Sequence, residues 1–258
     1  MTKVITTVHK QNYGCYGVLK MWHALNRQGH RIGRDRVGRL MRQAGLAGAV
    51  RGRHRTVTTH RDREAPRHPD RVNRGWDITV PNTVWVADFT YVWTYAGFCY
   101  VSFITDVASR MILGWKASMS KEASLVTGAL AQALFARRRG KVRFTSNGLI
   151  HHSDAGSQYT SIALTEKLAE AGIAGSIGTV GDALDNALME STIGLYKTEL
   201  IDTDPTRTWT SRQAVETATA EWVHWFNHQR LHSSIGYQSP IEYEHHFHLN
   251  RTREPLSA

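Results

Sequence analysis

Three acidic residues have the types and the spacing that metal-assisted chemistry on phosphodiesters requires. Sixty-five residues separate Asp88 from Asp154, and 35 separate Asp154 from Glu190. Mg²⁺ prefers carboxylate oxygens as ligands, and two ions roughly 4 Å apart can activate an attacking oxygen and stabilise a leaving one. The three carboxylates are therefore the candidate catalytic and metal-ligating residues, if the fold brings them together.

Asp88 lies within residues 84–90, an apolar run that is typical of a β-strand. Alternation along the strand places its side chain on the same face as Val86 and Thr90. A charge there is costly unless it is paired or metal-bound, although a bond to a neighbouring backbone group or arginine is the alternative. Asp106 precedes the turn at residues 107–109, and we interpret it as a cap of that turn.

Asp154 follows a strand at residues 149–153 and precedes a glycine turn, so it can project into a cleft. The alternative is an Asx-turn or a helix cap. Glu190 falls in the middle of a helix predicted for residues 182–200. Lys197 lies roughly 10 Å further along that helix, where it could touch a phosphate. Spacing alone favours a solvated lysine.

The elements that must position these residues begin with strands. Residues 83–93, 98–107 and 111–117 are rich in β-branched and aromatic residues and are joined by tight turns, which predicts an antiparallel meander. Helices are predicted at residues 121–138, 161–171, 182–200 and 211–229, and strands at 149–153 and 173–177. The fold class is α/β, a mixed sheet with helices packed on its faces.

A small basic helical region precedes this sheet. Apolar residues recur at helical spacing within residues 13–46, and glycines at 29 and 33 divide the pattern into two helices. The second helix, residues 34–44, carries Arg34, Arg36 and Arg39 on polar positions. A short helix, a glycine-containing turn and a basic helix resemble a helix-turn-helix, which predicts DNA contacts by these arginines.

Charge is distributed unevenly along the chain. Residues 1–80 carry 17 Lys/Arg and 5 Asp/Glu, whereas residues 81–258 carry 15 and 17. Such asymmetry favours a polyanionic partner, although a solvated basic face is the alternative. Residues 51–80 read as an extended basic linker, in which Arg51, Arg53 and Arg55 could follow a phosphate backbone.

Other features narrow the class of protein. Cys15 and Cys99 form no CxxC pair, which excludes a zinc finger and favours two buried thiols. We expect no membrane segment and no secretory signal, and hence a cytoplasmic, nucleoid-associated protein. The histidines at 245, 246 and 248 are interpreted as a solvated tail. The predicted domains are residues 1–50, 51–80, 81–245 and 246–258.

Several motifs in order resemble the transposases of bacterial insertion sequences with a retroviral-integrase-like core, family three in the usual naming. They are Trp85–Tyr91 around the first Asp, Asp106–Arg110 with Gly114-Trp115, His152–Tyr159 around the second Asp, Asp185–Glu190 with Lys197, and Phe226–His232 with Gly236-Tyr237 and Ser239-Pro240. The resemblance spans about residues 13–245.

This resemblance implies a ribonuclease-H-like fold and two Mg²⁺ or Mn²⁺ ions held by Asp88, Asp154 and Glu190. It implies cleavage at element ends and transfer of a 3′-hydroxyl into target DNA. Double-stranded DNA is then the partner, with Lys197, Gln158 and Tyr159 as contacts and a homo-oligomer assembled on it. Many family members receive their helix-turn-helix from an upstream reading frame, so the product of such a frame is a further expected partner.

Two other functions fit some of these features. A DNA-binding module without catalysis would explain the basic N-terminal third, but it would gain nothing from three convergent carboxylates that repel phosphate. A structure-specific nuclease on the same fold would cut DNA without joining it. A retroviral or phage integrase fits less well, because the His/Cys zinc module of retroviral enzymes is absent from the sequence.

Overall fold

A computed structural model describes residues 1–50, 68–72, 77–140, 144–154, 156–178, 187–203 and 208–253. Within these residues a five-stranded sheet has the order β3-β2-β1-β4-β5. The strands are β1 (Val84–Thr94), β2 (Gly97–Asp106), β3 (Ile112–Ser118), β4 (Ile150–Ser153) and β5 (Ala174–Ile177). The first three are antiparallel neighbours, whereas β4 and β5 run parallel to β1. The expected mixed sheet is confirmed.

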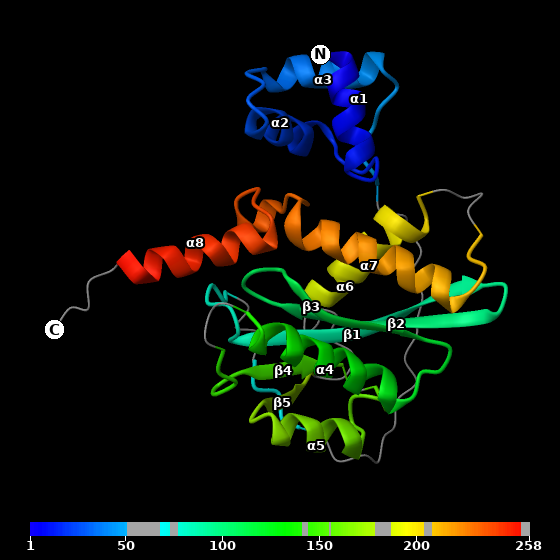
Figure 1. The fold of residues 1–258 in the computed structure, drawn as a ribbon, viewed down its shortest axis with the longest axis vertical. Coiled ribbons are helices and arrows are strands. Elements are labelled where there is room, and N and C mark those ends of the chain that lie inside the picture. The colour runs from blue at the N-terminus through cyan, green and yellow to red at the C-terminus, as the bar shows by residue number, and fades with distance from the viewer. Residues whose placement is uncertain are drawn as a thin grey trace.

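Helices cover both faces of this sheet (Figure 1). Helices α4 (Ala123–Arg138) and α5 (Ile162–Glu170) lie on one face, and α6 (Ala187–Tyr196) and α7 (Arg212–His228) lie on the other. Successive residues of β1 contribute to different apolar cores: Val84 and Val86 pack on the α6–α7 side, while Trp85 packs on the α4–α5 side. Burial of both faces explains why β1 is apolar almost throughout.

The turns between strands are fixed by side-chain bonds. Gly97 has φ +106°, a backbone conformation that glycine adopts readily, at the start of β2. Asp106 accepts hydrogen bonds from the Asn82 N–H (2.7 Å), the Ser109 N–H (2.9 Å) and the Ser109 hydroxyl (3.2 Å). The interpretation of Asp106 as a turn cap is confirmed.

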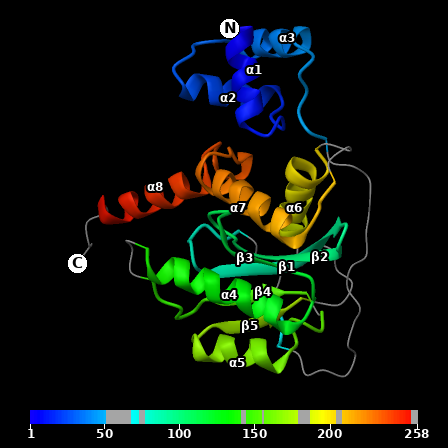
Figure 2. The same ribbon diagram turned by 45° about the vertical axis from the view of Figure 1, so that its right-hand side comes forward.

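The N-terminal unit contains three helices, α1 (Thr2–Gln11), α2 (Val18–Arg27) and α3 (Arg34–Gln43). They enclose a small core that includes Ile5, Leu25 and Val37. The two helices predicted from the sequence correspond to α2 and α3. Helix α1 was not predicted, because its polar residues outnumber its apolar ones and only Ile5, Val8 and His9 are buried. In both views this unit lies on the α7 side of the sheet (Figures 1 and 2).

A buried ion pair lies at the contact between this unit and the rest of the chain. The Arg230 guanidinium donates to both oxygens of Glu199, at 2.5 to 3.1 Å, and both side chains are almost fully buried. Tyr16 of the N-terminal unit closes the same region, where its hydroxyl accepts the Leu231 N–H at 2.8 Å. The Trp225 indole also donates to Asn12, at 3.2 Å.

Two helical predictions needed correction. The helix predicted to run regularly through residue 200 is α-helical only to Tyr196 and continues as a π-helical turn, η1 (Lys197–Ile201), in which Glu199, Leu200 and Ile201 are all buried. The predicted boundary at residues 245/246 falls inside helix α8 (Pro240–Arg253), so the histidines there are helical. Among the described residues, none of the helices is long and apolar enough to cross a membrane.

The buried pair predicts an unequal cost for two arginine substitutions. Arg230→Met leaves the Glu199 carboxylate buried without its partner, which should lower the free energy of unfolding by about 3–5 kcal/mol. Arg212→Met breaks an ion pair with Glu216 whose side chains are 48% and 41% exposed, and should cost at most about 1 kcal/mol. Urea unfolding measures the free energy of unfolding of both variants, and equal decreases would contradict the buried position of the Glu199–Arg230 pair.

Candidate active site

A difference in strand length brings two of the predicted carboxylates together. Strand β4 pairs in parallel with β1 up to the partners Ala87 and Ser153, where β4 ends. The residues that follow are Asp88 and Asp154. Side chains in register on adjacent strands point to the same face of a sheet, so both carboxyl groups emerge together where the pairing stops.

Local hydrogen bonds orient these two carboxyl groups. The Phe89 N–H donates to Asp88 Oδ1 at 2.7 Å, and the Gly156 N–H donates to Asp154 Oδ1 at 3.1 Å. Both aspartates therefore make the local backbone hydrogen bonds that the sequence analysis gave as alternatives to metal binding. They involve one oxygen of each group, so they fix the orientation of the carboxylates and are compatible with a ligand-binding role.

Asp88 is held in an environment that disfavours its charge. Burial raises the pKa of its carboxyl well above the ordinary value, and the negative charge of Asp154 raises it further, against the opposing hydrogen bond from Phe89. Glu190 adds a smaller contribution of the same sign. All three predicted carboxylates are thus close enough to interact electrostatically at Asp88.

Helix α6 presents Glu190 to this region. Met189, Thr192 and Tyr196 are its buried residues and hold the helix, which packs on β1. Glu190 itself is exposed and is the fourth described residue of α6. Its expected place in the middle of a longer helix stays a prediction. Residues 182–186, the predicted beginning of this helix, lie outside the described residues.

The three carboxylates fit a divalent metal ion in their chemistry. They are hard oxygen donors of the kind that Mg²⁺ and Mn²⁺ prefer, and a cation would offset the repulsion that raises the Asp88 pKa. Within the described part of the chain, however, no group of three or more His, Cys, Asp or Glu side chains lies close enough together to hold a metal ion. The donor set is suitable in its chemistry, although the exposed Glu190 is not gathered with the two aspartates into one group.

Lys197 lies at the open edge of β1 beyond Asp88. Its ammonium donates to the Tyr91 carbonyl and lies 5.0 Å from the centroid of the Tyr91 ring. Burial lowers the pKa of Lys197. The lysine is therefore half-buried and anchored, in contrast to the solvated lysine that spacing alone favoured.

The two other residues predicted to contact DNA near Asp154 differ in exposure. Gln158 is half-buried. Tyr159 is 2% exposed, and its ring lies 6.1 Å from that of Phe89. Burial raises the Tyr159 pKa well above its ordinary value, as do the charges of Asp88 and Asp154. Tyr159 thus packs beneath the two aspartates, and its burial does not support the predicted contact with DNA.

The predicted N-terminal contacts are only partly described. Arg34, Arg36 and Arg39 are all exposed on α3, as a surface for phosphates requires. The Arg34 side chain approaches Asp35 at 3.7 Å, but both are well solvated. The contacts predicted at Arg51, Arg53 and Arg55 lie outside the described residues.

Histidines beside Asp154 form no nucleophilic relay with Ser153. His152 Nδ1 lies 2.9 Å from the Ser176 hydroxyl on β5, and its ring is 4.0 Å from Asp70. Burial lowers the pKa of His151 to about 4, which keeps it neutral. This network ties residues 68–72 to β4 and β5, and sequence reasoning missed it because Asp70 belongs to a stretch read as linker.

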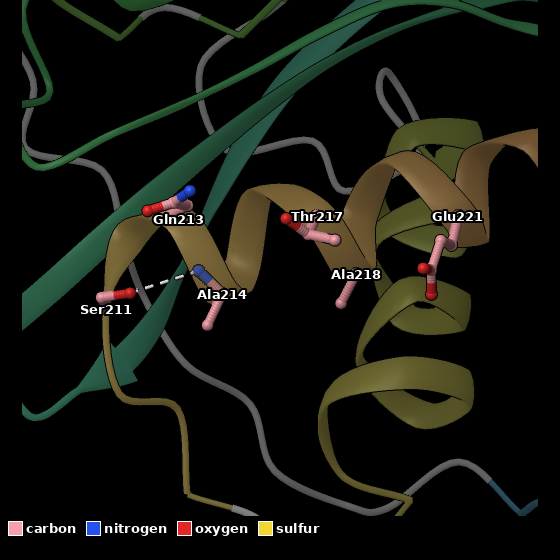
Figure 3. Close-up of a pocket in the computed structure, with 6 residues that line it drawn as sticks. All are labelled: Ser211, Gln213, Ala214, Thr217, Ala218 and Glu221. Atoms are coloured by element: carbon pink, nitrogen blue, oxygen red, sulfur yellow. Dashed lines mark hydrogen bonds between the residues drawn. The ribbon is translucent and has the colours of Figure 1, made fainter.

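Sequence reasoning also missed the pairing of Glu199 with Arg230. Arg230 belongs to the recognised stretch at residues 226–232, but nothing in its spacing indicates a partner 31 residues earlier. A polar hollow of about 420 Å³ lies on α7 and is lined by Ser211, Gln213, Ala214, Thr217, Ala218 and Glu221 (Figure 3). None of the three carboxylates lines it, so we assign it no part in the chemistry.

Comparison with known families matches nearly the whole chain. A model described as an HTH-like domain matches residues 1–54. Two models described as an integrase core domain match residues 79–183 and 171–240. The matched ranges agree with the helical unit and with the mixed sheet and its helices.

Relatives extend the match over most of their own lengths. The chain is 48% identical over 249 residues to the protein named for insertion sequence element IS986/IS6110 of Mycobacterium tuberculosis, covering 96% of this chain and 88% of that protein. It is 44% identical over 258 residues to the transposase for element IS629 of Shigella sonnei, covering 100% and 83%.

A solved structure supports the fold. A chain of the simian T-cell lymphotropic virus intasome in complex with PP2A regulatory subunit B56 gamma gives a TM-score of 0.52 at 14% identity, covering 95% of this chain and 74% of that one. The likeness concerns the fold alone. Together with the sheet order and the HTH-like match, it confirms the expected ribonuclease-H-like fold with a helical region before it.

The raised pKa of Asp88 predicts a pH-dependent gain in stability when its charge is removed. In the unfolded chain an aspartate ionises near pH 4, whereas folded Asp88 retains its proton to higher pH. The unfolded chain therefore binds fewer protons above pH 4, and the group lowers stability as the pH rises toward its folded pKa. Without metal, Asp88→Asn should raise the melting temperature at pH 7 by about 2 °C or more, since 1 kcal/mol corresponds to about 2–4 °C here.

The gain from Asp88→Asn should fall to a small remainder near pH 4, where roughly half of the unfolded aspartate is itself protonated. Thermal melts in EDTA at both pH values measure it. Asp35→Asn, at a side chain that is 92% exposed, serves as the control and should change neither melt. A loss of stability at pH 7 in Asp88→Asn would contradict the stated environment of Asp88.

Proposed function

The chain belongs to the insertion-sequence transposases with an integrase core domain, and we propose that it cuts DNA at the ends of an element and joins them to target DNA with Asp88, Asp154 and Glu190. The observation that supports this assignment is the meeting of Asp88 and Asp154 where β4 stops and β1 continues. The electrostatic effect of Glu190 on Asp88 extends the set to three.

The three carboxylates would hold two Mg²⁺ or Mn²⁺ ions. When bound, such a pair supplies activation of a water or 3′-hydroxyl and stabilisation of the leaving oxygen. The chain's own contribution is orientation: the N–H groups of Phe89 and Gly156 hold the aspartates in place. Because the Asp88 carboxyl resists ionisation in the metal-free fold, cation binding and loss of its proton should be linked.

DNA is the proposed partner for both parts of the chain. In the N-terminal unit, the exposed Arg34, Arg36 and Arg39 would contact phosphates of the element ends, and Arg51, Arg53 and Arg55 would continue along the backbone. Near the carboxylates, Lys197 and Gln158 would contact the strand that reacts. We further propose that the protein acts at the nucleoid as a homo-oligomer on DNA, with an upstream reading-frame product as an additional partner.

The joining reaction separates this proposal from a simple nuclease or a DNA-binding module. Purified full-length protein is incubated with Mn²⁺ and an end-labelled branched DNA that mimics a strand-transfer product. Wild type should resolve the branch into a joined strand. Asp88→Asn, Asp154→Asn and Glu190→Gln should each lower that rate on the order of a thousandfold, corresponding to about 4 kcal/mol, while DNA binding is retained.

Each other outcome points to a different function. Nicked fragments without joined strands would support a nuclease. Binding without reaction in all four proteins would support a module without catalysis. Retained joining in any one of the three variants would remove that residue from the site.

A second prediction concerns the arginines of α3. Removal of one arginine–phosphate pair should reduce the slope of log K against log salt concentration by about 0.9 for duplex DNA, because one fewer phosphate is neutralised by the protein. Arg36→Ala should show that reduction in anisotropy titrations, whereas Arg212→Ala, an exposed arginine of α7, should not. An unchanged slope for Arg36→Ala would place the phosphate contacts elsewhere.

A further inference from the structure

The hairpin of β1 and β2 carries a group of solvent-exposed aromatic side chains. Trp93 is 64% exposed, Tyr95 is 74% exposed and Phe98 is 44% exposed. Single exposed apolar residues are common on protein surfaces, whereas a contiguous group of them often marks an interaction site. We refer to Tyr91, Trp93, Tyr95 and Phe98 as the aromatic hairpin face.

Strand register places the strand residues of this group on one side of the sheet. Trp93 is paired with Phe98 and Tyr91 with Tyr100, and paired side chains of antiparallel strands point to the same face. The ring centroids of Trp93 and Phe98 are 4.8 Å apart, and those of Tyr91 and Phe98 are 5.0 Å apart. The rings therefore form one continuous surface.

The apolar core between the sheet and α4 includes none of the four rings. The Lys116 side chain of β3 runs against Gly128 of α4, so closely that an added Cβ would lie 2.4 Å from it. Lys116 is paired with Ser102, and Tyr100 and Phe98 lie further along the hairpin. Phe89, one row inward from Tyr91, is buried in the core of this face, and Tyr100 packs against the margin of that core. The outer rings contribute little to that core, so folding alone does not explain them.

The aromatic hairpin face lies on the same strand as Asp88, in the part of β1 that extends beyond the end of β4. Tyr91 follows Asp88 by three residues and Trp93 by five, which is about 10 Å and about 16 Å along an extended strand. Because both offsets are odd, the two rings lie on the opposite face of the sheet from the Asp88 carboxyl group. Beyond Ala87 this edge of β1 has no pairing with β4. A strand of DNA with a phosphate at the carboxylates could therefore pass over this open edge of β1 and place its next bases on the rings.

Positive charge lies beside the rings. The Lys197 ammonium is 5.0 Å from the centroid of the Tyr91 ring and is fixed there by its bond to the Tyr91 carbonyl. A cation next to exposed aromatic faces is the combination that binds single-stranded nucleic acid, because phosphates meet the charge while bases stack on the rings. A purely apolar contact between two protein copies would not require this charge.

We propose that the aromatic hairpin face binds unpaired bases of a single-stranded DNA segment next to the cleavage site. The inference rests on the proposed function, which supplies DNA as the partner. Trp93 provides the largest exposed ring and Tyr95 extends the surface at the turn. Stacking of this kind tolerates any base sequence, so the surface would recognise unpaired DNA and not a particular element end.

The test compares two DNAs that differ only in an unpaired segment. Full-length protein in EDTA is titrated by anisotropy with a blunt duplex and with the same duplex carrying a single-stranded thymidine tail. Trp93→Ala should weaken binding of the tailed DNA by about 5-fold to about 150-fold per stacked base and leave the blunt duplex unchanged. Trp93→Phe should restore most of the affinity, and Tyr95→Ala should reproduce the weakening in part.

The matched control is Phe135→Ala, which removes an aromatic side chain of α4 that is 59% exposed and should leave both affinities unchanged. Equal weakening on both DNAs in Trp93→Ala, or no weakening on either, would overturn the proposal. So would a dimer in light scattering that Trp93→Ala converts to a monomer, because the face would then bind a second copy. The titration measures binding and needs no catalysis. If wild type fails to join strands in the reaction above but binds the tailed DNA more tightly than the blunt duplex, only the proposed reaction is refuted.

Discussion

The structure depends on holding like charges together at the place where a short parallel strand ends beside a long one. Strand β4 stops at Ser153 while β1 runs on, and the next residue of each strand is an aspartate. Their repulsion and burial oppose ionisation of Asp88. The fold tolerates this cost because the strands on either side are anchored in two apolar cores, so the carboxyl groups cannot move apart. A carboxyl group whose pKa is raised in this way by burial and by a neighbouring charge is typical of functional sites.

The third carboxylate depends on a different set of contacts. Glu190 is placed by α6, and the π-helical turn after α6 is fixed at Glu199 by the buried guanidinium of Arg230. Tyr16 of the N-terminal unit bonds to the residue after Arg230, so the helical unit and the turn that follows α6 share one buried region. A buried ion pair of this geometry contributes more to a unique arrangement than to stability. It therefore links the DNA-binding part of the chain to the helix that carries Glu190.

Much of the core could be predicted from the sequence, because period-two and period-3.6 patterns mark strands and helices that are buried on a defined face. All five strands and helices α2 to α5 and α7 appear close to their expected positions. Helix α1 and the histidine-rich α8 were missed, since polar residues dominate both and leave too few apolar positions for a helical pattern. The π-helical turn, the Glu199–Arg230 pair and the docking of Asp70 near His152 depend on tertiary contacts that no local pattern encodes. Tyr159 was expected to contact DNA because of its motif, whereas its ring belongs to the buried core on the α4–α5 side of the sheet.

The central claim is that Asp88, Asp154 and Glu190 together form a metal site. Calorimetric titration of the full-length protein with Mn²⁺, in the presence of DNA, tests it most directly when wild type and Asp154→Asn are compared. The account predicts saturable Mn²⁺ binding to wild type that is abolished in Asp154→Asn while the variant still binds DNA. Equal Mn²⁺ binding by both proteins would contradict it, because the metal would then be held elsewhere.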